Sequence, residues 1–117
     1  MYKSDFSIKA AVLTSLNKPL EVKIIHPERL KRGQVLVKIL YSGVCRSQLM
    51  EATGKRGEDK WLPHLLGHEG SGIVEEIGPG VTKFKSGDKV ILTWIKSNGL
   101  EAPGAKYSHE GSTVNSG

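Results

Sequence analysis

The chain has 117 residues, of which 38% are hydrophobic and 25% charged, and its formal net charge is +5 at pH 7. This length suits one ordinary domain of about 100 to 200 residues and excludes a second full domain. The composition is that of a folded protein without a low-complexity block. The only basic pairs are Lys31-Arg32 and Lys55-Arg56, and no aromatic residues interleave with them, so we expect no nucleic-acid partner.

The single cysteine, Cys45, excludes an internal disulfide and favours a reducing compartment. No apolar stretch approaches the roughly 18 to 20 residues of a membrane span. The N-terminus also lacks the basic and apolar regions of a signal peptide. We therefore expect a cytoplasmic protein that has no membrane partner.

Short apolar runs between turn residues predict a mainly β fold. Residues 17–19 form a turn between the first two runs, which predicts a hairpin. Residues 34–42 are rich in Val, Ile and Leu, which predicts a strand buried on both faces. After Gly43, residues 45–52 have the length of about two helical turns before Gly54, which predicts one short helix. The strands are expected over residues 9–16, 20–25, 34–42, 70–77 and 89–95.

Residues 97–117 are polar, rich in Gly and Ser, and without periodicity. Such a stretch is either a real loop or a tail whose partner strands follow Gly117, and we favour the second interpretation. From Ser97 onward we therefore expect poor packing. An exposed strand edge there would favour self-association with a second copy.

Cys45, His68 and Glu69 supply a thiolate, an imidazole and a carboxylate, which are the donor types that bind zinc in tetrahedral geometry. Taken alone, a cysteine after a buried strand is more often a small hydrophobe. The context of His68 favours a metal, because glycines within residues 67–72 let the backbone approach an ion or cofactor closely. The alternative interpretation is a bulged strand edge without a metal, which would require the same glycines.

Three segments occur in the order and at the spacing of a known family. Residues 67–81 match G-H-E-x-x-G-x-V-x-x-x-G-x-x-V, residues 43–47 read Gly-Val-Cys-Arg-Ser, and residues 81–90 match V-x-x-F-x-x-G-D-x-V. Together they resemble the zinc-dependent medium-chain alcohol dehydrogenases, over about residues 10–94. The resemblance implies a GroES-like, partly open β barrel with one or more short helices. Residues 1–117 would be an incomplete catalytic domain of this kind, without the cofactor-binding Rossmann domain of the family.

The same resemblance implies an activity and a metal site. Cys45 and His68 would bind one catalytic zinc, and Glu69 would be the carboxylate that approaches the metal during ligand exchange. The activity would be hydride transfer between a small alcohol or aldehyde and NAD or NADP, with zinc as Lewis acid. The isolated chain is expected to be inactive, because the Rossmann domain that aligns the nicotinamide is missing.

Further roles and two departures also follow from the resemblance. Ser47 would hydrogen-bond the substrate alcohol, Arg46 would pair with the cofactor pyrophosphate, and Trp94 would line the substrate pocket. Gln48 replaces the acidic residue of the family and removes a charged partner of the ligand histidine, which would lower metal affinity. Met50 stands where many members have the histidine that ends the proton relay.

No cysteine occurs between Ile91 and Gly117, and Asn98 stands near the first cysteine position of the family's structural zinc site. We therefore predict one catalytic zinc and no structural zinc. The other histidines are expected to be solvated loop residues, with His109 the strongest adventitious metal contact. They are His26, His64 and His109.

Two other functions compete with the dehydrogenase. One is a stand-alone GroES-like binding or assembly module without catalysis, and the other is the zinc-free quinone reductase branch. Cys45 together with His68 and Glu69 argues against both, because neither class needs this donor set. The sequence does not identify the third zinc ligand, the substrate, or the choice between NAD and NADP.

Overall fold

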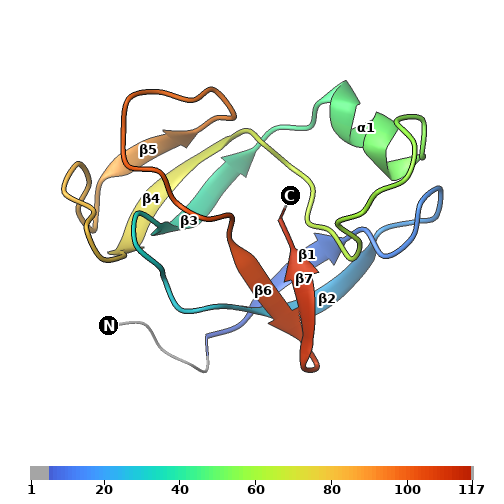
Figure 1. Ribbon diagram of the computed structural model, residues 1–117, viewed down its shortest axis with the longest axis horizontal. Helices are drawn as coiled ribbons and strands as arrows, with labels where there is room; N and C mark the ends of the chain where they lie inside the picture. The colour runs from blue at the N-terminus through green and yellow to red at the C-terminus, as the bar shows by residue number, and fades with distance from the viewer. Residues whose placement is uncertain (1–5, 117) are drawn as a thin grey trace. The chain divides into compact units, whose positions relative to one another are not determined.

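The mainly β class predicted from the sequence is confirmed. The computed structural model describes residues 6–116 (Figure 1). In chain order the elements of this part are β1 (Ile8–Val12), β2 (Glu21–Pro27), β3 (Val35–Ser42), α1 (Arg46–Ala52), β4 (Gly70–Ile77), β5 (Lys89–Leu92), β6 (Lys106–His109) and β7 (Ser112–Asn115). Within it, no helix is long and apolar enough to cross a membrane.

The chain divides into two compact units, and both are assembled from separate stretches of sequence. The first unit consists of Arg29–Gly43 and His68–Pro103. The second unit consists of residues 6–28, Val44–Gly67 and residues 104–116. The chain therefore passes from the first unit to the second directly before Val44 and returns directly before His68.

The first unit holds an antiparallel sheet in the order β3-β4-β5. Gly72, in the middle strand, pairs with Ile39 of β3 and Val90 of β5. A side chain at position 72 would collide with the carbonyl oxygen of Lys38, so β3 and β4 need glycine there. The register of β3 also shifts next to this pair, between Ile39 and Tyr41. The close pairing of β3 and β4 at this register shift thus by itself requires glycine at position 72.

The prediction that β3 is buried on both faces is wrong. Ile39 is 49% exposed and Tyr41 is 77% exposed. β3 is an edge strand of a three-stranded sheet, and Val74 is the one fully buried large hydrophobic residue that this unit has among the described residues. A continuous apolar run indicates a strand but does not by itself determine what covers it.

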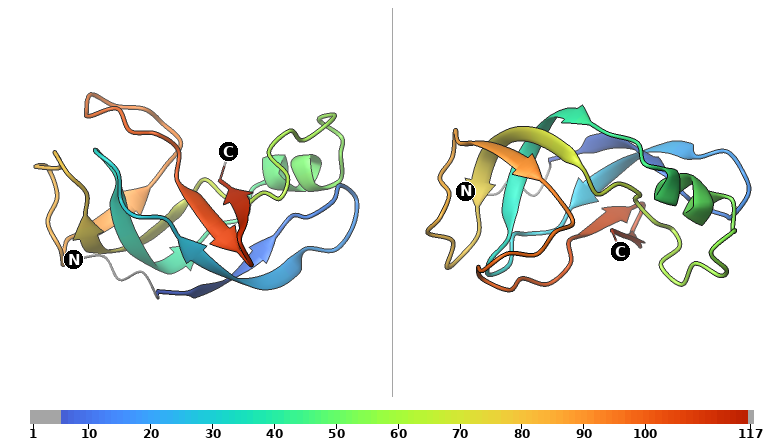
Figure 2. Two further views of the ribbon diagram at one scale, coloured as in Figure 1. Left: turned by 60° about the horizontal axis from the view of Figure 1, so that its bottom comes forward. Right: turned by 90° about the horizontal axis from the view of Figure 1, so that it is seen from above.

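The second unit holds a sheet in the order β1-β2-β6-β7, in which each strand is antiparallel to its neighbour (Figures 1 and 2). His64 connects its two edge strands through isolated bridges to Leu13 and Asn115. The backbone N–H groups of Leu13 and His64 each donate to the other residue's carbonyl oxygen at 2.9 Å. One residue thus links the two ends of an otherwise open sheet.

The hydrophobic core of the second unit joins residues far apart in the sequence. Val12 of β1, Ile25 of β2 and Val114 of β7 are at most 2% exposed and contact one another. Leu65 and Tyr107 pack against them. Burying branched aliphatic side chains of this size contributes roughly 1.5 to 3 kcal/mol each.

The expected poor packing from Ser97 onward is wrong for the last part of the chain. Residues 106–115 form the β6–β7 hairpin, which pairs with β2 through His26↔Ser108 and Pro27↔Tyr107. Val114 belongs to the core. The alternation that marks a strand is too short in two four-residue strands to stand out from a polar background.

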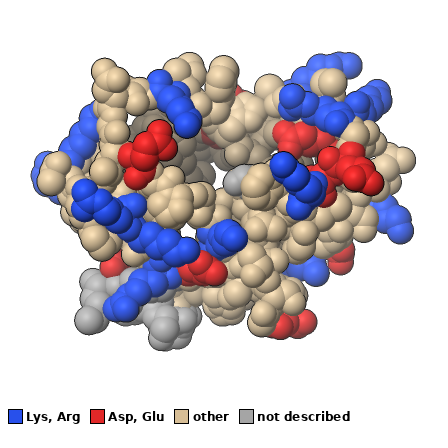
Figure 3. Space-filling view, viewed as in Figure 1, with Lys and Arg blue, Asp and Glu red and all other residues tan. Residues whose placement is uncertain are grey.

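Charges of both signs lie together on the surface. On the face shown in Figure 3, Lys and Arg side chains lie beside Asp and Glu side chains. Among the described residues, Arg56 forms an ion pair with Glu51 at 3.6 Å, Lys85 with Asp88 at 3.2 Å and Lys96 with Glu101 at 3.8 Å. Exposed pairs of this kind contribute little to stability.

Candidate metal and substrate site

Helix α1 begins directly after the predicted zinc ligand Cys45. Cys45 has extended backbone angles (φ −111°, ψ 151°) and occupies the N-cap position of the helix. Its backbone N–H donates to Oε1 of Gln48 at 2.6 Å, the interaction by which the third helical residue of a capping box closes back on the N-cap. The position of Cys45 is therefore fixed by a side chain from the first turn of the helix.

The sulfur of Cys45 has a hydroxyl neighbour. Ser47 Oγ donates to Cys45 Sγ at 3.4 Å, and both side chains are half-buried. A hydroxyl in this position can donate a hydrogen bond to a metal-bound sulfur. The structure therefore gives Ser47 a contact with the cysteine, in addition to the substrate contact implied by the resemblance.

Gln48 stands where the family has an acidic residue, and it forms a hydrogen bond that the sequence did not indicate. Its Oε1 holds the Cys45 backbone, and its Nε2 lies 3.3 Å from the place where a Cβ on Gly67 would stand. Gly67 directly precedes His68. Within the second unit, Gln48 thus bonds the residue before α1 and occupies part of the space that a side chain at position 67 would need.

His68, Glu69 and Trp94 belong to the first unit, whereas Cys45, Arg46 and Ser47 belong to the second. His68 is half-buried, Glu69 is exposed, and Trp94 is 72% exposed after the end of β5. Arg46 is exposed in the first turn of α1. The structure therefore divides the predicted residues between the two units.

Glu69 lies directly over Gly43. The backbone N–H of Gly43 donates to the Glu69 carbonyl oxygen at 3.2 Å. A Cβ on Gly43 would stand only 2.5 Å from Glu69 Oε1 and 2.9 Å from its Cγ. The carboxylate thus occupies the space that any larger residue at position 43 would fill.

A second group of ligand-type side chains lies elsewhere, in the second unit. Glu51, Asp59 and His64 each offer one ligand atom, and these atoms lie within 4.8 Å of one another. Both oxygens of Asp59 already accept hydrogen bonds, Oδ1 from the Trp61 backbone N–H and Oδ2 from His64 Nδ1, each at 2.8 Å. The group is therefore satisfied by its own protein contacts.

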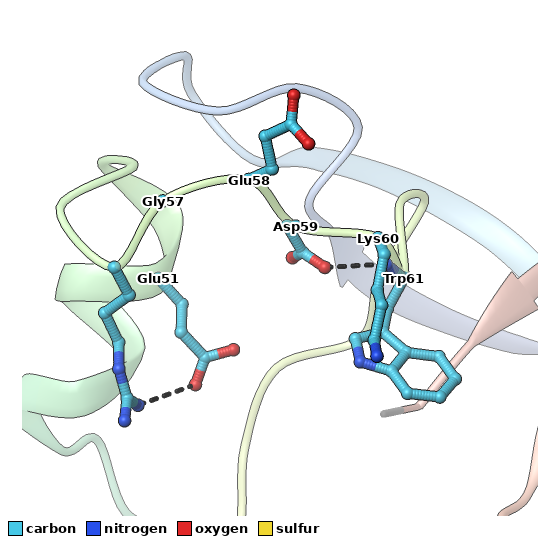
Figure 4. Close-up of a pocket in the computed structure, with 7 residues that line it drawn as sticks. Glu51, Gly57, Glu58, Asp59, Lys60 and Trp61 are labelled. Carbon is cyan, nitrogen blue, oxygen red and sulfur yellow. Dashed lines mark hydrogen bonds and ion pairs between the residues drawn. The ribbon is translucent and has the colours of Figure 1, made fainter.

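Figure 4 shows the pocket of about 330 Å³ beside this group. Its walls carry charges of both signs together with an aromatic ring. It includes none of the residues assigned to the metal or substrate site from the sequence. The lining residues are Glu51, Arg56, Gly57, Glu58, Asp59, Lys60 and Trp61.

The expectation of solvated loop histidines is wrong for His64, which is 6% exposed and bridges two strands. His109 lies in β6, and its Nδ1 is 2.8 Å from the Ile24 carbonyl oxygen. His26 lies in β2 and its Nδ1 is 3.1 Å from the Phe6 carbonyl oxygen. Pro63 beside His64 had suggested a loop, but its carbonyl oxygen accepts a strand-type bond from Asn115.

Comparison with known proteins identifies the family. Residues 31–115 match the model of the alcohol dehydrogenase GroES-like domain. This chain belongs to that family. An alcohol dehydrogenase from Geobacillus stearothermophilus is 44% identical over 90 residues, which are 77% of this chain and 27% of that protein. The chain thus spans about a quarter of the length of this dehydrogenase.

Solved structures of the alcohol dehydrogenase family have the same fold. The cobalt- and zinc-bound thermostable alcohol dehydrogenase from Pyrobaculum aerophilum is 31% identical, with a TM-score of 0.66 over 74% of this chain and 26% of that one. CAD from Helicobacter pylori, solved with NADP(H), is 31% identical, with a TM-score of 0.66 over 75% and 26%. The GroES-like fold implied by the sequence is therefore confirmed.

Proposed function

We propose that this chain carries the catalytic zinc of an alcohol dehydrogenase that transfers hydride between an alcohol or aldehyde and NAD or NADP. The observation that supports this most is the match of residues 31–115 to the family model, since this range contains Cys45, His68 and Glu69. Relatives with bound metal and bound NADP(H) are consistent with both cofactors. The substrate class is a small alcohol or aldehyde.

The donor set suits the metal. Zinc prefers thiolate and imidazole ligands, and Cys45 and His68 are half-buried residues of these two types. The Ser47 hydroxyl lies 3.4 Å from Cys45 Sγ and would support this sulfur as a ligand by a hydrogen bond. When bound, zinc would supply Lewis acidity that lowers the pKa of an alcohol hydroxyl. Glu69 would supply a carboxylate for ligand exchange.

The remaining residues would handle substrate and cofactor. The Ser47 hydroxyl would take the proton of the alcohol and pass it to water or to a cofactor ribose, because Met50 offers no imidazole for a relay. The Arg46 guanidinium is exposed in the first turn of α1 and would pair with a pyrophosphate. The exposed indole of Trp94 would provide apolar contact for the carbon chain of the substrate.

The nicotinamide would be held by a Rossmann domain outside these 117 residues, so the isolated chain would not oxidise alcohols. We further propose a cytoplasmic location, from the single reduced cysteine, and one zinc per chain. Self-association no longer follows from an unpaired tail, because β6 and β7 are paired with their neighbours.

Metal titration tests the proposal. We expect the chain to bind one equivalent of Co²⁺ or Zn²⁺, with a sulfur-to-cobalt absorption band in the near ultraviolet. Cys45→Ser should abolish the band, and His68→Ala should weaken binding at least about tenfold. His26→Ala, at a histidine of β2 outside the proposed site, is the matched control and should leave both unchanged. Equal binding by wild type and Cys45→Ser would contradict the proposal.

A binding or assembly module without catalysis is the second candidate. It is favoured by the β6–β7 hairpin, which builds the last residues into the sheet and contributes Val114 to the core. Such a module would need neither the thiolate nor the imidazole. Absence of bound metal under reducing conditions, in a chain shown to be folded by circular dichroism, would support it.

A further inference from the structure

We propose that Gly43 is a positioning residue for Glu69, so that the missing side chain at position 43 determines where the Glu69 carboxylate stands. This inference depends on the proposed function, in which Glu69 acts beside the zinc. It concerns two residues of the first unit only.

The contact between these residues is specific. The three heavy atoms nearest to a Cβ built on Gly43 all belong to the Glu69 side chain, at 2.5 Å for Oε1, 2.8 Å for Cδ and 2.9 Å for Cγ. Real Cβ atoms do not approach other heavy atoms this closely, so an alanine at position 43 would displace the carboxylate.

The displacement would leave the backbone in place. The φ angle of Gly43 lies outside the left-handed region, so alanine can adopt its conformation. The Gly43 N–H to Glu69 carbonyl bond at 3.2 Å involves main-chain atoms alone, and Ser42 pairs with Gly70 in the adjoining register. Alanine would therefore move a flexible, exposed side chain and little else.

Gly43 and Glu69 both lie close to the proposed zinc ligands in the sequence. Gly43 stands two residues before Cys45, and Glu69 directly follows His68. Residues that orient or support metal ligands typically change metal affinity by about 10- to 100-fold when they are altered. We therefore expect residue 43 to act on zinc affinity through Glu69.

A double-mutant cycle on the 117-residue chain tests the inference, with Zn²⁺ affinity measured by competition with a chromophoric chelator. Glu69→Gln should weaken binding about tenfold, and Gly43→Ala by a similar or smaller factor. In the double variant the Gly43→Ala change should have no further effect, because the carboxylate that it displaces is gone. Gly99→Ala is the matched control, since a Cβ there meets no atom within 4 Å.

The outcomes separate the inference from the proposed function. Equal weakening by Gly43→Ala in the wild-type and Glu69→Gln backgrounds would mean a general effect on the fold and overturn the inference. Wild-type affinity in Gly43→Ala would also overturn it. If the wild type binds no zinc through Cys45 and His68, the proposed function itself fails.

Discussion

The carboxylate of Asp59 lies 2.8 Å from Nδ1 of His64, and both side chains are only 7% exposed. Asp59 also accepts the backbone N–H of Trp61, so it joins a turn to a buried imidazole. The backbone of His64 bridges Leu13 and Asn115. The His64 backbone thus connects the segment between α1 and β4 to the two edges of the second sheet, and Asp59 holds the His64 side chain.

Replacing this imidazole should destabilise the second unit. His64→Ala removes a buried hydrogen bond to a carboxylate and leaves Asp59 with one partner fewer, a loss of roughly 1.5 to 3 kcal/mol. Chemical denaturation at neutral pH measures the free energy of unfolding. The double variant with Asp59→Ala should lose less than the sum of the single variants, because the two groups interact directly. Strict additivity would show that the observed contact contributes nothing.

Val114→Ala tests whether the tail hairpin belongs to the core. Val114 is 2% exposed, and its truncation should reduce the free energy of unfolding by roughly 1 to 3 kcal/mol. Val22→Ala in β2 is the matched control, since Val22 is 67% exposed. Amide exchange should be slow in β6 and β7 of the wild type. Fast exchange there, with no effect of Val114→Ala, would restore the original expectation for the tail.

Most of the fold could be predicted because its strands carry strong local signals. β4 has the bounds predicted from its apolar run and flanking glycines, and the short helix ends before Gly54 as expected. The tail hairpin and the burial of His64 could not be predicted, because both depend on strands that are distant in the sequence. Local composition predicts which element forms, but not which residues pack against it.

The candidate site was predicted as a set of residues but not as a set of contacts. The motifs around Cys45 and His68 identified the family that the comparison confirms. The contact of Glu69 with Gly43 and the cap formed by Gln48 are visible only in three dimensions. The expectation that Gln48 lowers metal affinity by removing a charged partner of the ligand histidine stays a prediction. The hydrogen bond from the Cys45 N–H to Gln48 is a separate contact that the resemblance does not indicate.

The cap gives Gln48 a measurable function. Gln48→Ala removes the acceptor at 2.6 Å from the Cys45 N–H and should destabilise the start of α1 by about 1 kcal/mol. Because Cys45 is the residue held by this bond, zinc affinity should fall as well. Gln48→Glu keeps the acceptor and should retain the stability, and its zinc affinity should be at least that of the wild type. A Gln48→Ala variant with unchanged stability and unchanged zinc affinity would contradict this function.

Tyr107 should make stability depend on alkaline pH. It packs against the core cluster that includes Val114, and burial raises the pKa of its phenol above the ordinary value of 10.0. Above pH 10 the unfolded chain therefore loses this proton before the folded chain does. The free energy of unfolding should fall with rising pH until the folded pKa is passed, by at most about 1.4 kcal/mol per pH unit. Tyr107→Phe keeps the ring but removes the hydroxyl proton. The difference in the free energy of unfolding between the wild type and Tyr107→Phe, measured by denaturation between pH 8 and 11, therefore reports this phenol and not the other titrating groups. A difference that stays constant over this range would show that the phenol is as solvated in the folded state as in the unfolded one.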